Sequence, residues 1–546
     1  MADRRSFLKP AKRIAAWTLL SRVTGLIRDI CLNTQFGQTW VQDAFNYGFQ
    51  IPNLFRRMFG EGALAAVFVP AFTETLDRDG RPAAWSLLAR VLARFTATLI
   101  SVTLAIELVV LAVWLIDPGG SMRRLILALT ALMLPFMIGI CVVGLLSSIL
   151  HCLGRFGAPA AMPIVLNLCM IVGILALGPA LGESPEARIF GPAIAVLVAG
   201  VLQLVLLRPV LRSAGVEVGL QWRRRDSAIS PLVLALIPVM LGQGVLLINT
   251  FLDTQMCTFL CRAPGASAEF TLFGRSIAYP LEAGALSAVT NAQRLYQFPL
   301  GVLAISLATA ALPAFSRFAI AGDTDGLREA LGRAMRLAVF EGLPCGLILV
   351  VLGEPIIRLL FEYGRFTPEH TARAAAVLRW YGLGVWAFCL HHVLLRGFYS
   401  MKDTRTPMWI GAALVGVNLL MNLTLIWIPT VREQAFSIST AVTASLNVGI
   451  SFWLLRRKLA RRIGGRAFLA TIVKTLGMSL VAAGAAWWIH TAIGDGRLVP
   501  GTIINRAISV GAPLLGAMLI YLGLAALAGM QELRWLFGRE RADGAM

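Results

Sequence analysis

Charged residues and the residue types that most often carry chemistry are scarce in this sequence. Only 14% of its 546 residues are charged, and it has five histidines and eight cysteines. The cysteines are scattered through apolar segments without the spacing of zinc or redox sites, so we interpret them as packing residues. His391 and His392 are adjacent, which turns them toward different helix faces. These shortages argue against an enzyme, a metal centre and a soluble domain, and we predict no catalytic residues.

In place of charge, the chain has apolar runs from end to end. Examples are "LIPVMLGQGVLLINTFL" and "APLLGAMLIYLGLAALAGM", within a chain that is 57% hydrophobic. Such runs are long enough to cross about 30 Å of hydrocarbon as helices. A closed barrel would instead show short alternating strands. We therefore predict an all-α polytopic membrane protein with about fourteen transmembrane helices.

The formal net charge of +20 is distributed over the connections between apolar runs. Basic connections such as "MADRRSFLKPAKR" and "RRKLARRIGGR" alternate with connections such as "GPALGESPEAR" that have no basic excess. The positive-inside rule then predicts a multi-pass protein with both termini in the cytoplasm. A nucleic-acid partner is not expected, because its basic footprint would cluster on a folded soluble face.

Three sequence echoes recur in the same order in the two halves of the chain. "FQIP" at 49–52 returns as "YQFP" at 296–299, "AAVFVPAF" returns as "ATAALPAF", and "GRFGAPAAMPIVLNL" resembles "GFYSMKDTRTPMWIGAALVGVNL". We predict two pseudo-symmetric six-helix lobes, residues 1–225 and 226–463, and two additional helices in residues 464–546. Parallel repeats of this kind are typical of alternating-access transporters, whose site lies between the halves near mid-membrane.

The second predicted span carries a polar stripe with spacings of 3, 4, 3 and 4, which places its members on one helix face. One interpretation is a hydrogen-bonded seam between helices. We favour the other, a water-filled cavity, because two members carry formal charges. The stripe consists of Asp43, Asn46, Gln50, Asn53 and Arg57.

Arginines accompany this stripe at membrane depth. Arg57 can pair with Glu61 four residues later, whereas Arg56 has no local partner and follows Pro52, which we expect to kink the helix. Further arginines are Arg22 and Arg28, with Asp29, in the first span, and Arg294 in the second half. Placing Arg22, Arg28, Arg56 and Arg294 at the centres of isolated membrane helices would cost on the order of 10 kcal/mol in total. The positive excess therefore predicts an anionic ligand held by guanidinium groups, whose geometry suits phosphate.

A cation site is a weaker prediction. Asn418 and Asn422 lie four residues apart, and Asn249 is on another span. Their amide oxygens could bind a cation, although a packing seam is the interpretation that we favour.

The sequence resembles the MurJ (MviN) lipid II flippases of the multidrug/oligosaccharidyl-lipid/polysaccharide exporter superfamily. The likeness rests on "SRVTGLIRD", "DAFNYGFQIPNLFRRMFGEGALAAVFVPAF", "QRLYQFPLGVLAISLATAALPAFS", "LLFEYGRFT" and "GFYSMKDTRTP", and it covers most of the chain. The resemblance implies a fourteen-helix, two-lobed transporter that moves lipid II from the cytoplasmic to the outer leaflet of the bacterial inner membrane. It also implies that the last two helices form a groove for the lipid tail.

The resemblance assigns roles to residues already noted. Its cationic cavity positions match Arg22, Arg28, Arg56, Arg57 and Arg294, and its acidic positions match Asp29, Asp43 and Glu61. Two departures stand out. Gln293 occupies a position that is often acidic, and the segment between the seventh and eighth spans, about residues 262–285, is longer than usual. Asn249, Asn418 and Asn422 occupy positions that bind sodium in some relatives, but all three are neutral.

The sequence thus predicts a flippase that binds lipid II and needs no cofactor. Return of the empty, positive cavity would be driven by the membrane potential, and the coupling ion stays open. Membrane lipids and the cell-wall synthesis machinery are further expected partners. Three alternatives stay open: a flippase for another polyprenyl-linked oligosaccharide, a cation-coupled drug exporter, and a membrane enzyme acting on a polyprenyl substrate.

Overall fold

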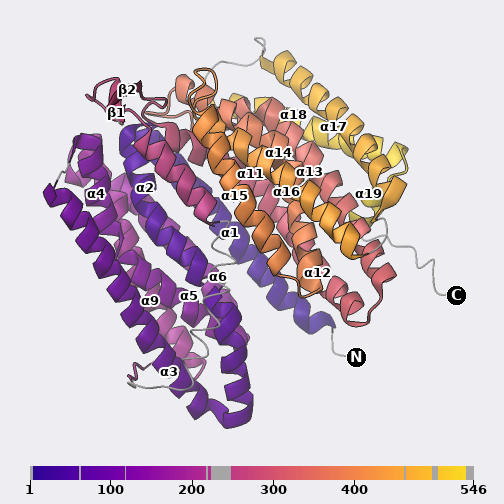
Figure 1. Cartoon of the computed structure of the whole chain (residues 1–546), viewed down its shortest axis with the longest axis horizontal. Helices are drawn as coiled ribbons and strands as arrows, with labels where there is room; N and C mark the ends of the chain where they lie inside the picture. The colour runs from indigo at the N-terminus through magenta and orange to yellow at the C-terminus, as the bar shows by residue number, and fades with distance from the viewer. Residues whose placement is uncertain are drawn as a thin grey trace. The chain divides into compact units, whose positions relative to one another are not determined.

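The computed structural model describes residues 4–60, 63–116, 119–216, 219–222, 247–272, 274–459, 463–494 and 502–536. These residues are overwhelmingly helical (Figure 1). In the described ranges, ten helices are long and apolar enough to cross a membrane. The predicted all-α polytopic fold class is confirmed, whereas the count of fourteen spans stays a prediction. The length and hydropathy criterion leaves out α1 and α14, each 33 residues long.

The chain divides into two compact units. Unit 1 comprises Met1–Gly284 with Tyr363–Phe366, and unit 2 comprises Ala285–Glu362 with Thr367–Met546. Packing therefore groups the helix at 247–259 and the segment after it with the first half of the chain. The division at about residues 225 and 463 is based on the internal sequence repeat and not on packing, and it stays a prediction.

Unit 1 contains long helices interrupted at prolines and glycines. Its α3 includes Gly80 at φ 81°, a left-handed conformation that glycine adopts without strain, so two helical stretches meet there at a sharp bend. The labelled elements of unit 1 are α1 (Arg4–Phe36), α2 (Trp40–Phe55), η1 (Arg56–Gly60), α3 (Ala63–Ile116), α4 (Ser121–Met133), α5 (Phe136–Cys152), α6 (Gly157–Val172), η2 (Gly173–Leu177), α7 (Gly178–Leu181), α8 (Pro185–Arg188), α9 (Phe190–Ser213), β1 (Glu269–Leu272) and β2 (Arg275–Ala278).

The strands form an antiparallel hairpin in which Glu269 pairs with Ala278 and Leu272 with Arg275. This hairpin occupies the segment that the sequence marked as longer than usual. Its role stays open, and it is a small β addition to the helical fold class that we predicted.

All the regular secondary structure in the described residues of unit 2 is helical. Helices α13 and α14 lie close together, because Gly346 brings its Cα against the backbone of Gly382 and leaves no room for a Cβ. The elements of unit 2 are α11 (Ala285–Val302), α12 (Ala304–Ile320), α13 (Thr324–Phe361), α14 (Pro368–Ser400), α15 (Arg405–Leu425), α16 (Gln434–Lys458), α17 (Gly465–Gly494), α18 (Ile503–Leu527) and α19 (Gln531–Leu536).

Each unit has its own apolar core. In unit 1, Phe36, Phe45 and Leu129 are buried where α1, α2 and α4 pack with α5, α6 and α9. In unit 2, one core lies along α12, α13, α14 and α16, and a second joins α13 to α17 and α18 through Phe340 and Tyr521. The second core attaches the two additional helices to α13.

Candidate functional site

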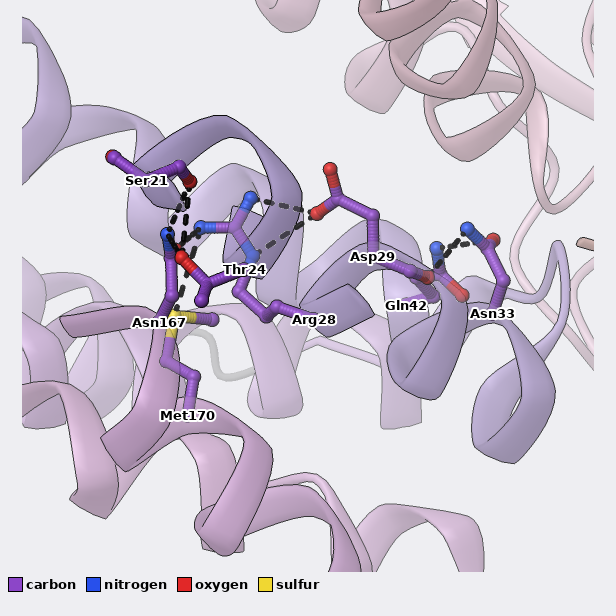
Figure 2. A network of polar contacts seen from close by, with 8 residues as sticks. All are labelled: Ser21, Thr24, Arg28, Asp29, Asn33, Gln42, Asn167 and Met170. Atoms are coloured by element: carbon purple, nitrogen blue, oxygen red, sulfur yellow. Dashed lines mark hydrogen bonds and ion pairs between the residues drawn. The ribbon is translucent and has the colours of Figure 1, made fainter. Parts of the chain in front are cut away.

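Arg28 of α1 lies in a network of polar contacts (Figure 2). It is 8% exposed, and its Nε and Nη2 atoms donate to Asp29 Oδ1 at 3.0 and 2.6 Å. Its Nη1 atom donates to Asn167 Oδ1 of α6 at 3.0 Å. Burying a guanidinium is tolerable here because a carboxylate and an amide oxygen both meet it.

Asn167 completes the connection between α6 and α1. Its Nδ2 atom donates to the Ser21 carbonyl and to Thr24 Oγ1, each at 3.2 Å. Gly25 lies against the same amide, and a Cβ there would be 3.4 Å from Nδ2. One asparagine thus contacts a full turn of α1 while it accepts from Arg28. Arg28 therefore has a structural position between two helices, in addition to any role toward a ligand.

The network continues toward α2. Asn33 Nδ2 donates to the Asp29 carbonyl at 2.9 Å, and Gln42 Nε2 donates to Asn33 Oδ1 at 3.0 Å. Arg22 lies on α1 one turn and a half before Arg28 and is partly exposed. Of the two arginines predicted on α1, Arg28 is the buried one.

The polar stripe on α2 contacts the segment that precedes α11. Asp43 is 2% exposed, and its Oδ2 atom accepts from the Gly284 backbone N–H at 2.7 Å. Gly284 has φ 90°, and a Cβ there would clash with the Gln38 carbonyl. Only glycine permits this approach. Asp43 therefore fixes the chain where unit 1 ends.

The next turns of α2 contact the helix at 247–259. Gln50 Nε2 donates to the Thr250 carbonyl at 3.0 Å, and the Tyr47 hydroxyl donates to Gln255 Oε1 at 2.9 Å. For Asp43 and Gln50, these bonds are what the seam interpretation predicts. Asn46, Asn53 and Arg57 are partly exposed, and for them the cavity interpretation stays a prediction.

The paired arginines lie where α2 changes helical type. Residues Arg56–Gly60 form the π-helical turn η1, and Arg56 Nε donates to Asn53 Oδ1 at 3.0 Å. The prediction that Arg56 has no local partner is therefore wrong, because an amide three residues earlier on the helix reaches it. Pro52, inside α2, cannot donate to the preceding turn, which loosens the helix just before this change. Arg56 and Arg57 are both partly exposed. Glu61, the predicted partner of Arg57, lies outside the described residues.

In unit 2, Arg294 is exposed on α11. Its neighbour Gln293 donates from Nε2 to the hydroxyl of Tyr381 at 3.1 Å, and Tyr381 stacks on Tyr296 with ring centroids 4.6 Å apart. The neutral amide at position 293 thus packs against an aromatic pair. An acidic side chain there could only accept from the Tyr381 hydroxyl, so the direction of this hydrogen bond would be reversed.

The cation candidates are divided between the units. Asn249 lies in unit 1 and is partly exposed. Asn418 and Asn422 are buried between α15 and α16, where Asn422 Nδ2 donates to Asn418 Oδ1 at 2.9 Å and the Ser439 hydroxyl donates to Asn422 Oδ1. Both amide oxygens are thus engaged in a seam, and Asn418 Nδ2 also reaches Ser439 and Thr443. Among the described residues, no group of three His, Cys, Asp or Glu side chains could hold a metal ion.

Sequence reasoning missed Asn167, which is an isolated polar residue in an apolar run. The internal repeat held a signal for it: "PIVLNL" in the first half and "LVGVNL" in the second place Asn167 and Asn418 at matching positions. Each asparagine binds a neighbouring helix in its own unit. The Tyr47–Gln255 bond had no comparable signal, because it joins positions 208 residues apart.

Residues 32–504 match the model of a family described as "Lipid II flippase MurJ". A relative from Rhizobium tropici, described as a probable lipid II flippase MurJ, is 31% identical over 538 residues that cover 96% of this chain and 95% of the relative. A solved structure described as lipid II flippase MurJ in an inward closed conformation has a TM-score of 0.74 at 20% identity and covers 95% of this chain and 99% of that one. An outward-facing multidrug resistance transporter of the MATE family and MOP superfamily has a TM-score of 0.54 at 12% identity, covering 83% and 96%.

Proposed function

We propose, from the premise that this chain belongs to the lipid II flippase MurJ family, that it moves lipid II from the inner to the outer leaflet of the cytoplasmic membrane. The match to the family model over residues 32–504 carries this conclusion. It agrees with the ten helices in the described residues that can cross a membrane. The chain is then a multi-pass inner-membrane transporter that supplies peptidoglycan synthesis and not a catalyst of bond chemistry.

For the substrate contact, we propose that guanidinium groups bind the diphosphate of lipid II. Arginine stays charged inside a membrane and presents paired N–H donors that match phosphate oxygens. The proposed set is Arg22, Arg28, Arg56, Arg57 and Arg294. Arg28 already donates to Asp29 and Asn167, so its binding to phosphate would require those bonds to be exchanged. We assign the leading roles to one arginine from each half of the chain, Arg56 and Arg294.

The transport cycle follows from this binding. The diphosphate and sugar-peptide head would cross through a water-filled path while the polyprenyl chain stays in hydrocarbon, with residues 464–546 as its groove. Alternate opening to the two sides would be set by differential binding of the loaded and empty states. Both termini lie in the cytoplasm in this proposal, as the basic connections favour. Proteins of cell-wall synthesis are the partners that this placement makes accessible.

The membrane potential would act mainly on the empty transporter. A potential of 100 mV is worth about 2.3 kcal/mol per elementary charge, and a cavity of arginines is drawn toward the negative inside. A diphosphate neutralises much of that charge. The return step should therefore depend on the potential more than the loaded step does. Headgroup exposure at the outer leaflet after the potential is collapsed measures this, and undiminished exposure would count against it.

Complementation tests the proposal as a whole. Cells depleted of their own lipid II flippase should grow when this chain is expressed. Cells expressing Arg56→Ala should fail to grow at equal membrane level and melting temperature. Arg78→Ala is the matched control, because the Arg78 side chain is 72% exposed and pairs locally with Glu74 and Asp79. Growth with both variants would refute the arginine assignment, and no growth with the well-folded parent would refute the function.

A further inference from the structure

The centre of α13 contains a proline whose missing hydrogen bond is replaced from another helix. Pro344 has no N–H, so the Phe340 carbonyl, four residues earlier, loses its partner within α13. The Tyr521 hydroxyl of α18 donates to that carbonyl at 2.6 Å. Phe340 and Tyr521 also pack as rings, with centroids 5.1 Å apart. The second of the two additional helices is thus held on α13 at a point where α13 lacks one of its own backbone hydrogen bonds.

Glu341 lies beside this junction with an unsatisfied carboxyl atom. Its Oε2 atom is buried and has no hydrogen-bond partner in the described part of the chain. Its neighbour Gly342 packs against α14, where a Cβ would come within 3.1 Å of Cys389 Sγ. Glu341 as a residue is partly exposed, and Oε2 is the carboxyl oxygen that the packing around α13 encloses. An ionisable group in this position is expected to have a function.

The titratable groups around Glu341 come from α13 itself, from α14 and from α18. Cys345 is one turn further along α13, Cys389 is on α14 and Tyr521 is on α18, and each interacts electrostatically with Glu341. Glu532 of α19 interacts with Tyr521. On α17, the side chain of Lys474 is exposed. None of the buried neighbours carries a positive charge.

Glu532 shows how the same part of unit 2 treats a carboxylate that does have a cation. It is fully buried, and its Oε1 atom accepts from Arg336 Nε and from Thr471 Oγ1, each at 2.6 Å. Arg336 in turn lies over the Trp535 ring, 4.8 Å from its centroid. Glu532 Oε2, like Glu341 Oε2, has no hydrogen-bond partner among the described residues, so the two carboxyls differ in the ion pair that Arg336 makes with Glu532. An ionised group without a partner costs several kcal/mol inside a protein, so it takes up a proton instead.

We propose that Glu341 is a proton-binding site inside the membrane, at the junction of α13 with α14 and α18. In its acid form the carboxyl is neutral and the Tyr521–Phe340 contact stays closed. Loss of the proton places a negative charge beside an apolar contact and favours separation of α17 and α18 from α13. Proton occupancy is thereby linked to how the two additional helices pack, independently of the arginines and of the transported lipid.

Infrared difference spectroscopy tests the site directly. The protein is reconstituted in lipid nanodiscs, and the spectrum of Glu341→Gln is subtracted from that of the parent. Glutamine has the same shape and no charge, so the variant should fold. The difference should contain the carbonyl stretch of a protonated carboxylic acid at neutral pH. That band should decrease by up to about tenfold per pH unit on the alkaline side of its midpoint, since each unit changes the proton concentration tenfold.

Glu532→Gln is the matched control, because Arg336 pairs with Glu532 and its difference should show carboxylate bands instead. Carboxylate bands for Glu341 at neutral pH would overturn the proposal. Within the described ranges, the buried Ser479 hydroxyl on α17 also has no hydrogen-bond partner, so a sodium ion is the rival occupant. Spectra in sodium chloride and choline chloride should be identical. Conversion of the acid band to carboxylate bands by sodium would overturn the proposal and show that Glu341 binds a cation instead.

Discussion

At the scale of single residues, the predicted arginines differ in what their side chains contact. Arg28 binds Asp29 and Asn167 inside unit 1, whereas the proposal assigns Arg56 to the substrate. The two residues should therefore respond differently to substitution. A structural arginine affects stability first, and a binding arginine affects transport first.

Replacement of Arg28 by alanine should destabilise the protein by about 1–3 kcal/mol, because the buried Asn167 side-chain oxygen would lose its donor and the bonds to Asp29 would be lost. Thermal unfolding in detergent measures this as a lower melting temperature. Arg78→Ala, at an exposed side chain, should change the melting temperature little. Equal melting temperatures for the two variants would contradict the structural role of Arg28.

At the scale of elements, prolines determine where helices need outside partners. Pro344 leaves the Phe340 carbonyl of α13 without its helical donor, and the Tyr521 hydroxyl donates to that carbonyl instead. Tyr521→Phe should therefore cost about 1–3 kcal/mol, because it leaves the carbonyl unpaired. In a Pro344→Ala background, the restored N–H can bind the Phe340 carbonyl. The cost of Tyr521→Phe should then largely disappear. A double-mutant cycle of melting temperatures measures the coupling, and simple additivity would contradict it.

The turn between α14 and α15 contains a carboxylate that holds the end of α16. Burial favours the acid form of Asp403, but bonds from Lys458 and Thr406 outweigh it, and its pKa falls below the usual 3.8. A carboxyl whose pKa is lowered by folding stabilises the folded state above the unfolded pKa. That stabilisation is lost as the pH falls through the folded value.

Asp403→Asn should therefore lower the melting temperature at pH 7, and the difference from the parent should disappear as the pH falls through the lowered folded pKa of Asp403. The effect should be small, about 1 kcal/mol or less, because the Lys458 side chain is 42% exposed. Melting curves across pH 2–7 for both proteins measure it. A difference that persists at the lowest pH would show that the loss comes from packing instead of charge.

At the scale of the whole molecule, the sequence predicted the helical membrane fold well. Apolar runs and lipid thickness decide that class, since lipid leaves few alternatives to helices. The repeat, the stripe on α2 and the arginines could also be read directly. Bonds between distant positions could not, because helical periodicity shows which face a residue occupies but not which helix it meets. The Asn167–Arg28 and Asp43–Gly284 bonds are examples.

The segment after residue 260 is a second feature that could not be predicted from the sequence. Its hairpin is short and lies beyond the apolar runs, so the hydropathy pattern that located the helices carries no information about it. The Glu341 carboxyl is a third case. A single glutamate in an apolar helix does not reveal whether a cation reaches it, and only the packing of α13 with its neighbours supplies that answer.

The central claim is that this chain moves lipid II outward and does so through arginines. The most direct measurement is the amount of lipid II headgroup accessible to a membrane-impermeant reagent on cells depleted of their own flippase. Expression of this chain should restore accessibility to the undepleted level, Arg78→Ala should match it, and Arg56→Ala should stay at the depleted level. Accessibility that the folded, membrane-inserted parent fails to restore would contradict the account.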